Sequence, residues 1–324
     1  MVNELRSVRR QDIYKRFKRY FTVLYTPFLA NGEIDVAGLR HNVETTLKLP
    51  GVGGLSVHSI HQEFWTLTQA ERCQVTEIVL DTVAGRVPTI VGVSDTTVQN
   101  VVDQARHASE CGADAVMVWP PYYGPKTADG IQKFYETIAA RIDCSFFVYS
   151  TTLTELGFYL TPSMVKALLP IDNLVGVQNS TMDFSAYAAM MVEVGHTISV
   201  ATSLEEYFLF GKLVYPDIAP DFMMGASRPL LVQNAQHPRC ERFITHALAG
   251  DVQQASVQLR EIVSIAQKLQ SRYFANGFHH LALSKALSTH VGLKGGDLRP
   301  PGGALDPDEL HECREIMRQA MFNT

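Results

Sequence analysis

Leu174-Val175-Gly176-Val177-Gln178-Asn179-Ser180 is an apolar run that ends in polar side chains. Such a run is typical of a strand that is buried on both faces of a parallel sheet, with its polar end at the edge of that sheet. Similar short runs recur along the whole chain. The eight predicted strands cover residues 20–25, 53–57, 89–93, 115–119, 145–149, 174–178, 198–201 and 221–224.

Amphipathic stretches with a helical period separate several of these strands, at residues 36–49, 68–84, 96–111 and 129–140. Each begins at or just after an Asp or Thr that suits a helix N-cap, and Thr68 and Glu71 have the spacing of a capping box. Eight strand and helix units close most simply into one α/β domain, a (β/α)8 TIM barrel. An open, doubly wound sheet is the competing architecture, but no glycine-rich nucleotide fingerprint follows the first strand.

Three segments are expected along the chain. Residues 1–19 form a basic N-terminal extension, residues 20–238 the barrel, and residues 239–324 an additional C-terminal helical segment packed on it. No apolar stretch of the kind that a secretory signal needs follows the basic residues, so we expect a solvated extension rather than a targeting peptide. Its aromatic residues Tyr14, Phe17 and Tyr20 are candidates for packing the extension onto the barrel.

The composition narrows the class of function. The formal net charge is -5 with both signs interspersed, so neither nucleic acid nor an anionic membrane surface is expected as a partner. No run approaches the roughly 18 to 20 apolar residues that a membrane-spanning helix needs. The 5 cysteines are scattered and include no C-x-x-C pair, which fits reduced thiols in a cytoplasmic protein.

Several motifs point to one protein family. They are Thr26-Pro27-Phe28, Leu67-Thr68-x-x-Glu71-Arg72, Pro121-Tyr122-Tyr123, the strand that ends in Tyr149, and Arg299-Pro300-Pro301. Spread over nearly the whole chain, they resemble the family of dihydrodipicolinate synthase and N-acetylneuraminate lyase, which are lysine-dependent aldolases. The resemblance implies a TIM barrel with C-terminal helices, a small-molecule substrate, and association as a homodimer or homotetramer.

The predicted sixth strand departs from this family at one position. The resemblance places the family's Schiff-base lysine at Gln178, and an amide cannot form an imine. An amide can instead donate a hydrogen bond to an oxyanion or accept one from a hydroxyl. Lys126 is the nearest alternative amine, but a solvated lysine is a poor imine former. We therefore expect that the chain is not a lysine-dependent class I aldolase.

The stretch after the predicted second strand also departs from the family. Ser59-Ile60-His61-Gln62-Glu63 stands where the family has G-(S/T)-T-G-E, which holds the carboxylate of a 2-oxo acid. Ile60 has no hydroxyl to relay a proton. Two histidines on a short loop are not a specific metal-ligand pattern, so we expect neither a metal nor another cofactor. His61 is interpreted as an acid/base catalyst, and the predicted substrate-binding residues here are His58, Ser59, Gln62 and Glu63.

Tyr149 falls on the family's catalytic tyrosine, and a phenol can donate a proton at neutral pH. A wall residue of the pocket is the alternative interpretation. The following stretch, residues 150–155, lacks the arginine with which the family's dihydrodipicolinate synthases grip their second substrate, so we expect that the chain is not one of these synthases. Other predicted substrate-binding residues are Thr26, Tyr123, Ser180, Thr202 and Gly225. The alternative interpretation of Thr26 is that it caps its loop, and that of Tyr123 is that it packs at a subunit interface.

The predicted function is an aldolase-superfamily lyase or hydro-lyase that breaks or forms a carbon-carbon or carbon-oxygen bond in a carbonyl-containing, 2-oxo acid-like molecule. Catalysis is expected to be non-covalent acid/base chemistry by Tyr149, His61 and Gln178. The alternative is a non-catalytic ligand-binding or regulatory homologue of a lysine-dependent aldolase, which the fold alone does not separate from an enzyme. The enzyme is favoured because a site without catalytic activity would not need the titratable histidines that replace the family's residues in this stretch.

Overall fold

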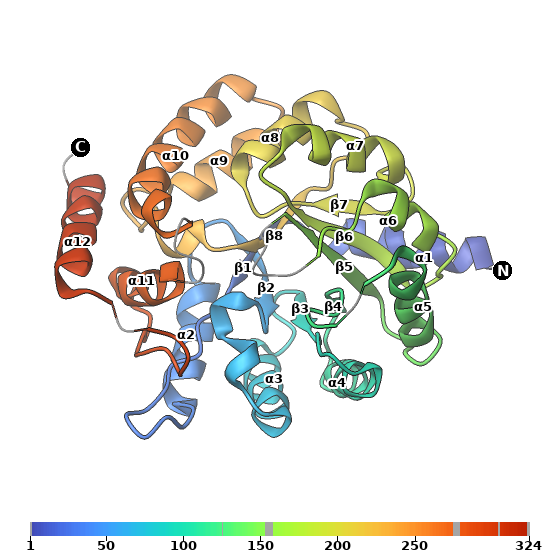
Figure 1. The fold of residues 1–324 in the computed structure, drawn as a ribbon. Helices are drawn as coiled ribbons and strands as arrows, with labels where there is room; N and C mark the ends of the chain where they lie inside the picture. Colours follow the sequence, from blue (N-terminus) through green and yellow to red (C-terminus); the bar gives the residue numbers. More distant parts are fainter. Residues whose placement is uncertain (1, 125, 153–157, 275–278, 304, 323–324) are drawn as a thin grey trace.

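Eight parallel strands lie at the centre of the protein and helices surround them (Figure 1). The computed structural model describes residues 2–124, 126–152, 158–274, 279–303 and 305–322. Each predicted strand is present, with its ends shifted by no more than a few residues. The strands are β1 (Arg19–Val23), β2 (Val52–Val57), β3 (Thr89–Gly92), β4 (Ala115–Val118), β5 (Phe146–Thr151), β6 (Leu174–Ser180), β7 (Ser199–Ala201) and β8 (Phe222–Ala226).

The strands close into a barrel. Their order is β7-β6-β5-β4-β3-β2-β1-β8, so the chain adds each strand beside the previous one and β8 returns to pair with β1. At the remaining seam, the Met224 N–H donates a hydrogen bond of 2.9 Å to the carbonyl of Thr202, just after β7. The predicted (β/α)8 TIM barrel with C-terminal helices is therefore confirmed.

The helices that follow the strands begin where the sequence places their caps. Thr68 and Glu71 form the predicted capping box, and the hydroxyls of Thr97 and Thr127 cap the next two barrel helices. These helices are α2 (Val36–Leu47), α3 (Gln69–Val83), α4 (Val98–Glu110), α5 (Ala128–Ala139), α6 (Pro162–Leu168), α7 (Phe184–Val194) and α8 (Glu205–Val214). Short 3-10 turns η1 (Ile60–Gln62), η2 (Phe64–Thr66) and η4 (Arg228–Leu230) follow β2 and β8.

Aromatic rings fill the barrel at the amino ends of its strands. Phe17 lies 4.5 Å from Phe21 and 5.4 Å from Phe222 between ring centroids, and Phe147 joins the same group. The extension is therefore less solvated than expected: it forms helix α1 (Val2–Arg16), and Ile13 and Phe17 are buried. Burial of these apolar side chains closes one end of the barrel and leaves the carboxyl ends of the strands as the open end.

The C-terminal segment packs beside the barrel (Figure 1). One apolar cluster joins Tyr20 and Met223 of the barrel with Phe243, Ile262 and Leu283 of the following helices. No helix in the described ranges is long and apolar enough to cross a membrane. The helices of the segment are α9 (Arg239–Leu248), α10 (Val252–Phe274), α11 (His279–Leu287), the 3-10 turn η5 (Ser288–Val291) and α12 (Pro307–Phe322).

Candidate active site

A cavity of about 120 Å³ lies at the carboxyl ends of the strands. This is the end at which (β/α)8 enzymes carry their active sites, because loops from all eight strands meet there. All three residues predicted to be catalytic line the cavity, together with four of those predicted to bind substrate. These seven residues are His58, Ser59, His61, Tyr149, Gln178, Ser180 and Gly225.

Tyr149 and Gln178 lie side by side because β5 and β6 pair in the register that puts them opposite each other. Ser180 follows Gln178 by two positions, so its side chain is on the same face of the strand. The Gln178 Nε2 donates a hydrogen bond of 3.2 Å to the Ser180 Oγ. The side chains of Ser180 and Thr151 lie close enough to the Tyr149 hydroxyl to lower its pKa. Ser180 therefore lies between the phenol and the amide at one side of the cavity.

The surroundings of Tyr149 favour the protonated phenol. Burial raises the pKa of Tyr149, and the nearby side chains of Ser180 and Thr151 oppose that shift only in part. The indole of Trp119 stacks on the ring, with 4.3 Å between centroids and 13° between planes. The stack holds the Tyr149 ring in one orientation, and the raised pKa favours a phenol that can donate a proton over one that acts as a base.

Gly225 allows the amide of Gln178 to lie against β8. Its φ of +73° is in the left-handed region, which glycine adopts readily. A Cβ at this position would lie 2.6 Å from the Gln178 Nε2, far inside van der Waals contact. A larger residue at 225 would therefore displace the amide from the cavity wall.

His61 reaches the cavity from the turn η1. Ser59 begins this turn, and its Oγ accepts a hydrogen bond of 3.2 Å from the His61 N–H. The imidazole is mostly buried and lies with its edge toward the ring of Tyr25, at 5.9 Å between centroids. The cavity therefore holds an imidazole in addition to the phenol and the amide, and such groups can transfer protons or bind an oxyanion.

The side chain of His58 is engaged away from a substrate. Its Nε2 lies 2.9 Å from the carbonyl of Arg72 and 3.0 Å from the Thr76 Oγ1, both on α3. Burial and the charge of Arg72 lower the pKa of His58 to about 3. The ring of His58 is therefore neutral at physiological pH and connects the end of β2 to α3. These contacts explain its place in the cavity wall as structural.

This neutral histidine predicts an acid-sensitive fold. The pKa of His58 is about 3 in the folded protein, whereas an unfolded histidine has a pKa of about 6.5. Between these pKa values the unfolded chain binds a proton that the folded protein does not bind. The contribution of His58 to the free energy of unfolding is therefore complete above about pH 6.5 and is lost as the pH falls. Urea unfolding is expected to show a loss of about 1.4 kcal/mol per pH unit from this group. His58→Gln should flatten that slope, because glutamine does not titrate in this range.

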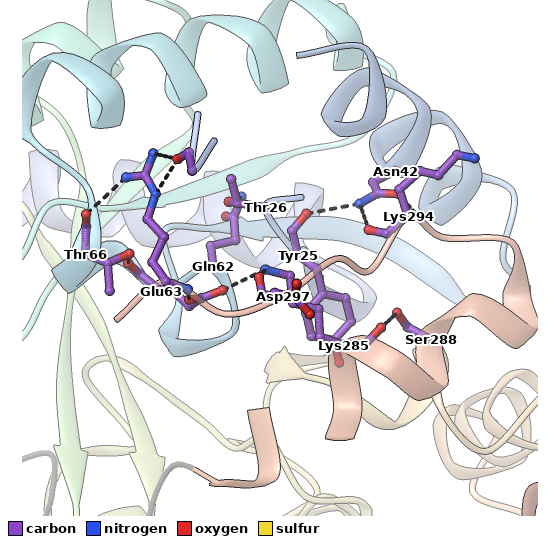
Figure 2. Close-up of polar contacts among 12 residues, drawn as sticks. Tyr25, Thr26, Asn42, Gln62, Glu63, Thr66, Lys285, Ser288, Lys294 and Asp297 are labelled. Atoms are coloured by element: carbon purple, nitrogen blue, oxygen red, sulfur yellow. Dashed lines mark hydrogen bonds and ion pairs between the residues drawn. The ribbon is translucent and has the colours of Figure 1, made fainter. Parts of the chain in front are cut away.

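Five predicted substrate-binding residues do not line this cavity. The Gln62 Oε1 accepts a hydrogen bond of 2.6 Å from the His58 N–H. The Gln62 Nε2 donates one of 3.2 Å to the Thr26 Oγ1, which joins two loops, and Figure 2 shows these two side chains. Glu63 faces the C-terminal segment instead. Thr202 lies at the barrel seam, and the Tyr123 side chain is exposed to solvent. Thr26, Gln62 and Glu63 each have a hydrogen bond or an ion pair inside the protein, so their polar groups have partners without a substrate.

Sequence reasoning missed two charged residues near this site. Arg228 lines the cavity just after β8, and its position at a strand end was a usable signal. Its Nη1 lies 2.6 Å from Glu205 and 2.7 Å from Glu206, so both carboxylates compensate its charge. Lys285 is buried against Glu63. No sequence signal places Lys285 there, because the two residues are far apart in the chain.

No group of three or more His, Cys, Asp or Glu side chains that could hold a metal ion occurs in the part of the chain that the structure describes. Absence of a metal and of any other cofactor remains a prediction.

Comparison with known proteins points to one family. A model of the dihydrodipicolinate synthetase family matches residues 16–320. The 4-hydroxy-tetrahydrodipicolinate synthase of Nitrobacter hamburgensis is 32% identical over 91% of this chain and 96% of its own length. The enzyme of the same name from Thermus thermophilus is 29% identical over 93% of this chain and 95% of its own length. The solved dihydrodipicolinate synthase of Oceanobacillus iheyensis has a TM-score of 0.81 and 23% identity, and covers 96% of this chain and 98% of its own.

These similarities correct one expectation. The sequence-based exclusion of a dihydrodipicolinate synthase is wrong, because relatives named 4-hydroxy-tetrahydrodipicolinate synthase match most of the chain at 29% and 32% identity, and a solved dihydrodipicolinate synthase matches 96% of it. The exclusion relied on one missing arginine in a stretch of which residues 153–157 lie outside the described residues. In a barrel, loops after several strands contribute to the same site, so the loss of one side chain from one loop does not exclude an activity.

Proposed function

Because the chain belongs to the dihydrodipicolinate synthetase family, whose members are lyases of the aldolase superfamily, we propose that it acts as a lyase or hydro-lyase by non-covalent acid/base catalysis. The proposed substrate is a carbonyl-containing, 2-oxo acid-like small molecule. One observation carries the proposal: Tyr149, Ser180 and Gln178 lie together at the wall of one cavity, and Gln178 occupies the position at which the resemblance puts the Schiff-base lysine.

Each residue has a separate task in the proposed reaction. The Gln178 amide donates a hydrogen bond to the oxygen on which negative charge develops, and Tyr149 delivers a proton to the substrate's oxygen. His61 transfers the second proton from the other loop. No lysine is among the described residues that line the cavity, which supports a route without an imine.

A trapping experiment tests the absence of a Schiff base. Treatment with borohydride and pyruvate is expected to leave the intact mass of the protein unchanged, because reduction traps only an imine. A lysine-dependent homologue treated in parallel should gain mass and serves as the positive control. A reduced pyruvate adduct mapped to any lysine of this chain would show that its chemistry is covalent.

A thermal-shift screen identifies the ligand class. Screening 2-oxo acids, their aldol adducts and hydroxy or enone analogues should reveal compounds that raise the melting temperature, because a ligand that binds only the folded state stabilises it. Turnover of such a compound supports the enzyme. Binding without turnover of any stabilising compound would instead favour the non-catalytic homologue.

We also propose that the chain forms a homodimer or homotetramer through the loop after β4. The Tyr123 side chain is 84% exposed, and the partly exposed Tyr122 and Trp65 also carry aromatic surface. Exposed aromatic surface of this kind is typical of subunit contacts. Light scattering at micromolar concentration is expected to give a dimer or larger, and Tyr123→Asp should shift it toward the monomer. A monomeric wild type would contradict both the proposed association and the interpretation of Tyr123 as an interface residue.

A further inference from the structure

Lys285 of α11 is a buried lysine that the proposed chemistry does not use. Its side chain is 1% exposed and that of Glu63 is 2% exposed. The Lys285 Nζ lies 2.8 Å from the Glu63 Oε1 and 2.9 Å from the carbonyl oxygen of Asp297 (Figure 2). It also lies 4.5 Å from the ring centroid of Phe28, as a cation above an aromatic face. A buried charge needs such partners, so this pair is a built contact.

Glu63 occupies the junction of the two 3-10 turns that follow β2. Its φ of 54° and ψ of 40° are left-handed, which residues other than glycine adopt with difficulty. Its carboxylate accepts one hydrogen bond from Lys285 and, through Oε2, one of 2.9 Å from the Arg299 N–H. Two donors from the C-terminal segment thus hold a residue whose left-handed backbone joins the two turns of the 59–66 loop.

Both sides of Glu63 lead to the cavity. On the amino side, the turn η1 carries His61, two residues away. On the carboxyl side, the ring of Phe64 lies edge-on to Trp119 at 5.4 Å between centroids, and Trp119 stacks on Tyr149. A shift of Glu63 therefore moves the imidazole directly and loosens the aromatic wall behind the phenol.

We propose that the ion pair between Lys285 and Glu63 is a positioning device for the candidate active site. Through it the C-terminal segment fixes the 59–66 loop, and with that loop the orientation of His61 and of the Trp119 and Tyr149 stack. Lys285 is a positioning residue, because it contacts Glu63 and does not line the cavity. The consequence for turnover rests on the proposed function, whereas the placement of the loop does not.

A second ion pair with a buried cation and a half-exposed carboxylate provides a control. Arg239 of α9 is buried, and its Nε lies 2.9 Å from the Glu261 Oε2 on α10. Unlike the pair of Lys285 and Glu63, this pair lies entirely within the C-terminal segment, and neither Arg239 nor Glu261 belongs to the 59–66 loop or lines the cavity. Loss of this pair reports what a purely structural ion pair contributes.

Trp119 provides a readout that needs no substrate. The chain contains only 2 tryptophans, Trp65 and Trp119, so Trp65→Phe leaves the stacked indole as the sole reporter. In this background, Lys285→Met is expected to raise the acrylamide quenching constant of Trp119 roughly twofold or more, because local opening exposes the indole. Far-UV circular dichroism should be unchanged. Glu261→Gln should leave the quenching constant at its starting value.

The outcomes separate the possibilities. An unchanged quenching constant in folded Lys285→Met, or an equal rise in Glu261→Gln, overturns the proposal. If Lys285→Met does not fold, Glu63→Gln is measured instead, because it removes the carboxylate charge at nearly the same side-chain size. An unchanged quenching constant of Trp119 in Glu63→Gln would equally overturn the proposal. Because quenching is measured without a substrate, a failure of the proposed chemistry would leave this result intact.

Discussion

Tyr149→Phe is expected to lower turnover roughly 100-fold or more, because it removes a proton donor positioned at the reacting oxygen. Phenylalanine keeps the stack on Trp119, which places the ring at 4.3 Å between centroids, so the fold should persist. His61→Ala should cause a loss of comparable size. The loss should appear in kcat more than in KM, since the proton transfers strengthen in the transition state. Steady-state kinetics on a substrate from the thermal-shift screen measure it.

A matched phenol controls this experiment. Tyr122→Phe removes a hydroxyl from a partly exposed tyrosine that does not line the cavity, and it is expected to keep full turnover. Gln178→Leu should lower turnover by about two to three orders of magnitude if its amide binds the oxyanion. Survival of turnover after replacement of Tyr149, His61 and Gln178 together would refute the assigned chemistry. So would loss of turnover on addition of a chelator.

Arg228→Met is expected to destabilise the fold by about 3–5 kcal/mol, because it leaves a buried carboxylate without its partner. The Arg228 Nη1 lies 2.6 Å from the Glu205 Oε2, and the side chain of Glu205 is fully buried. The same carboxyl accepts a hydrogen bond of 3.1 Å from the Tyr20 hydroxyl, inside the apolar cluster that joins the barrel to the C-terminal segment. Urea unfolding measures the loss.

The pH dependence of this loss identifies its cause. Burial raises the pKa of Glu205 and the charge of Arg228 opposes the shift, so removal of Arg228 raises the pKa further. When the pKa of a carboxyl is higher in the folded than in the unfolded protein, the free energy of unfolding falls as the pH rises. The destabilisation caused by Arg228→Met should therefore shrink toward about pH 4 and grow as the pH rises.

Two further variants separate charge from packing. Glu205→Gln combined with Arg228→Met should recover part of the loss, because it removes the unpaired charge. Arg318→Met, which breaks the exposed pair with Glu315, should have no measurable effect. A loss in Arg228→Met that is equal at all pH values would mean that packing, and not the uncompensated carboxylate, causes it.

The sequence predicted the barrel because local patterns carry that information. Short apolar runs such as 174–178 separated by amphipathic stretches specify parallel strands with covering helices, and the hydroxyl of Thr68 specifies where one helix begins. Position at a strand end then placed Tyr149 and Gln178 at the cavity, since the carboxyl ends of parallel strands meet at one face of a barrel.

The exclusion of a dihydrodipicolinate synthase shows where sequence motifs were overinterpreted. Loss of one arginine was taken to exclude an activity, although relatives with that activity in their name match over most of the chain. Motifs describe the residues that one family branch uses. They do not describe the other side chains that the same barrel can bring to the same place.

Side-chain directions were decided only by the tertiary structure. His58 and His61 belong to one short loop, yet the Nε2 of His58 contacts α3 and the ring of His61 lies beside Tyr25, because the left-handed backbone at His58 and the turn η1 direct the two side chains differently. Glu63 was expected to bind substrate, but the folded C-terminal segment brings Lys285 against it. The sequence alone determined which elements form and at which end of the barrel polar groups gather, since both follow from neighbours along the chain. Only the tertiary structure decided which of these groups face the cavity and which are paired, because burial creates contacts between residues far apart in sequence.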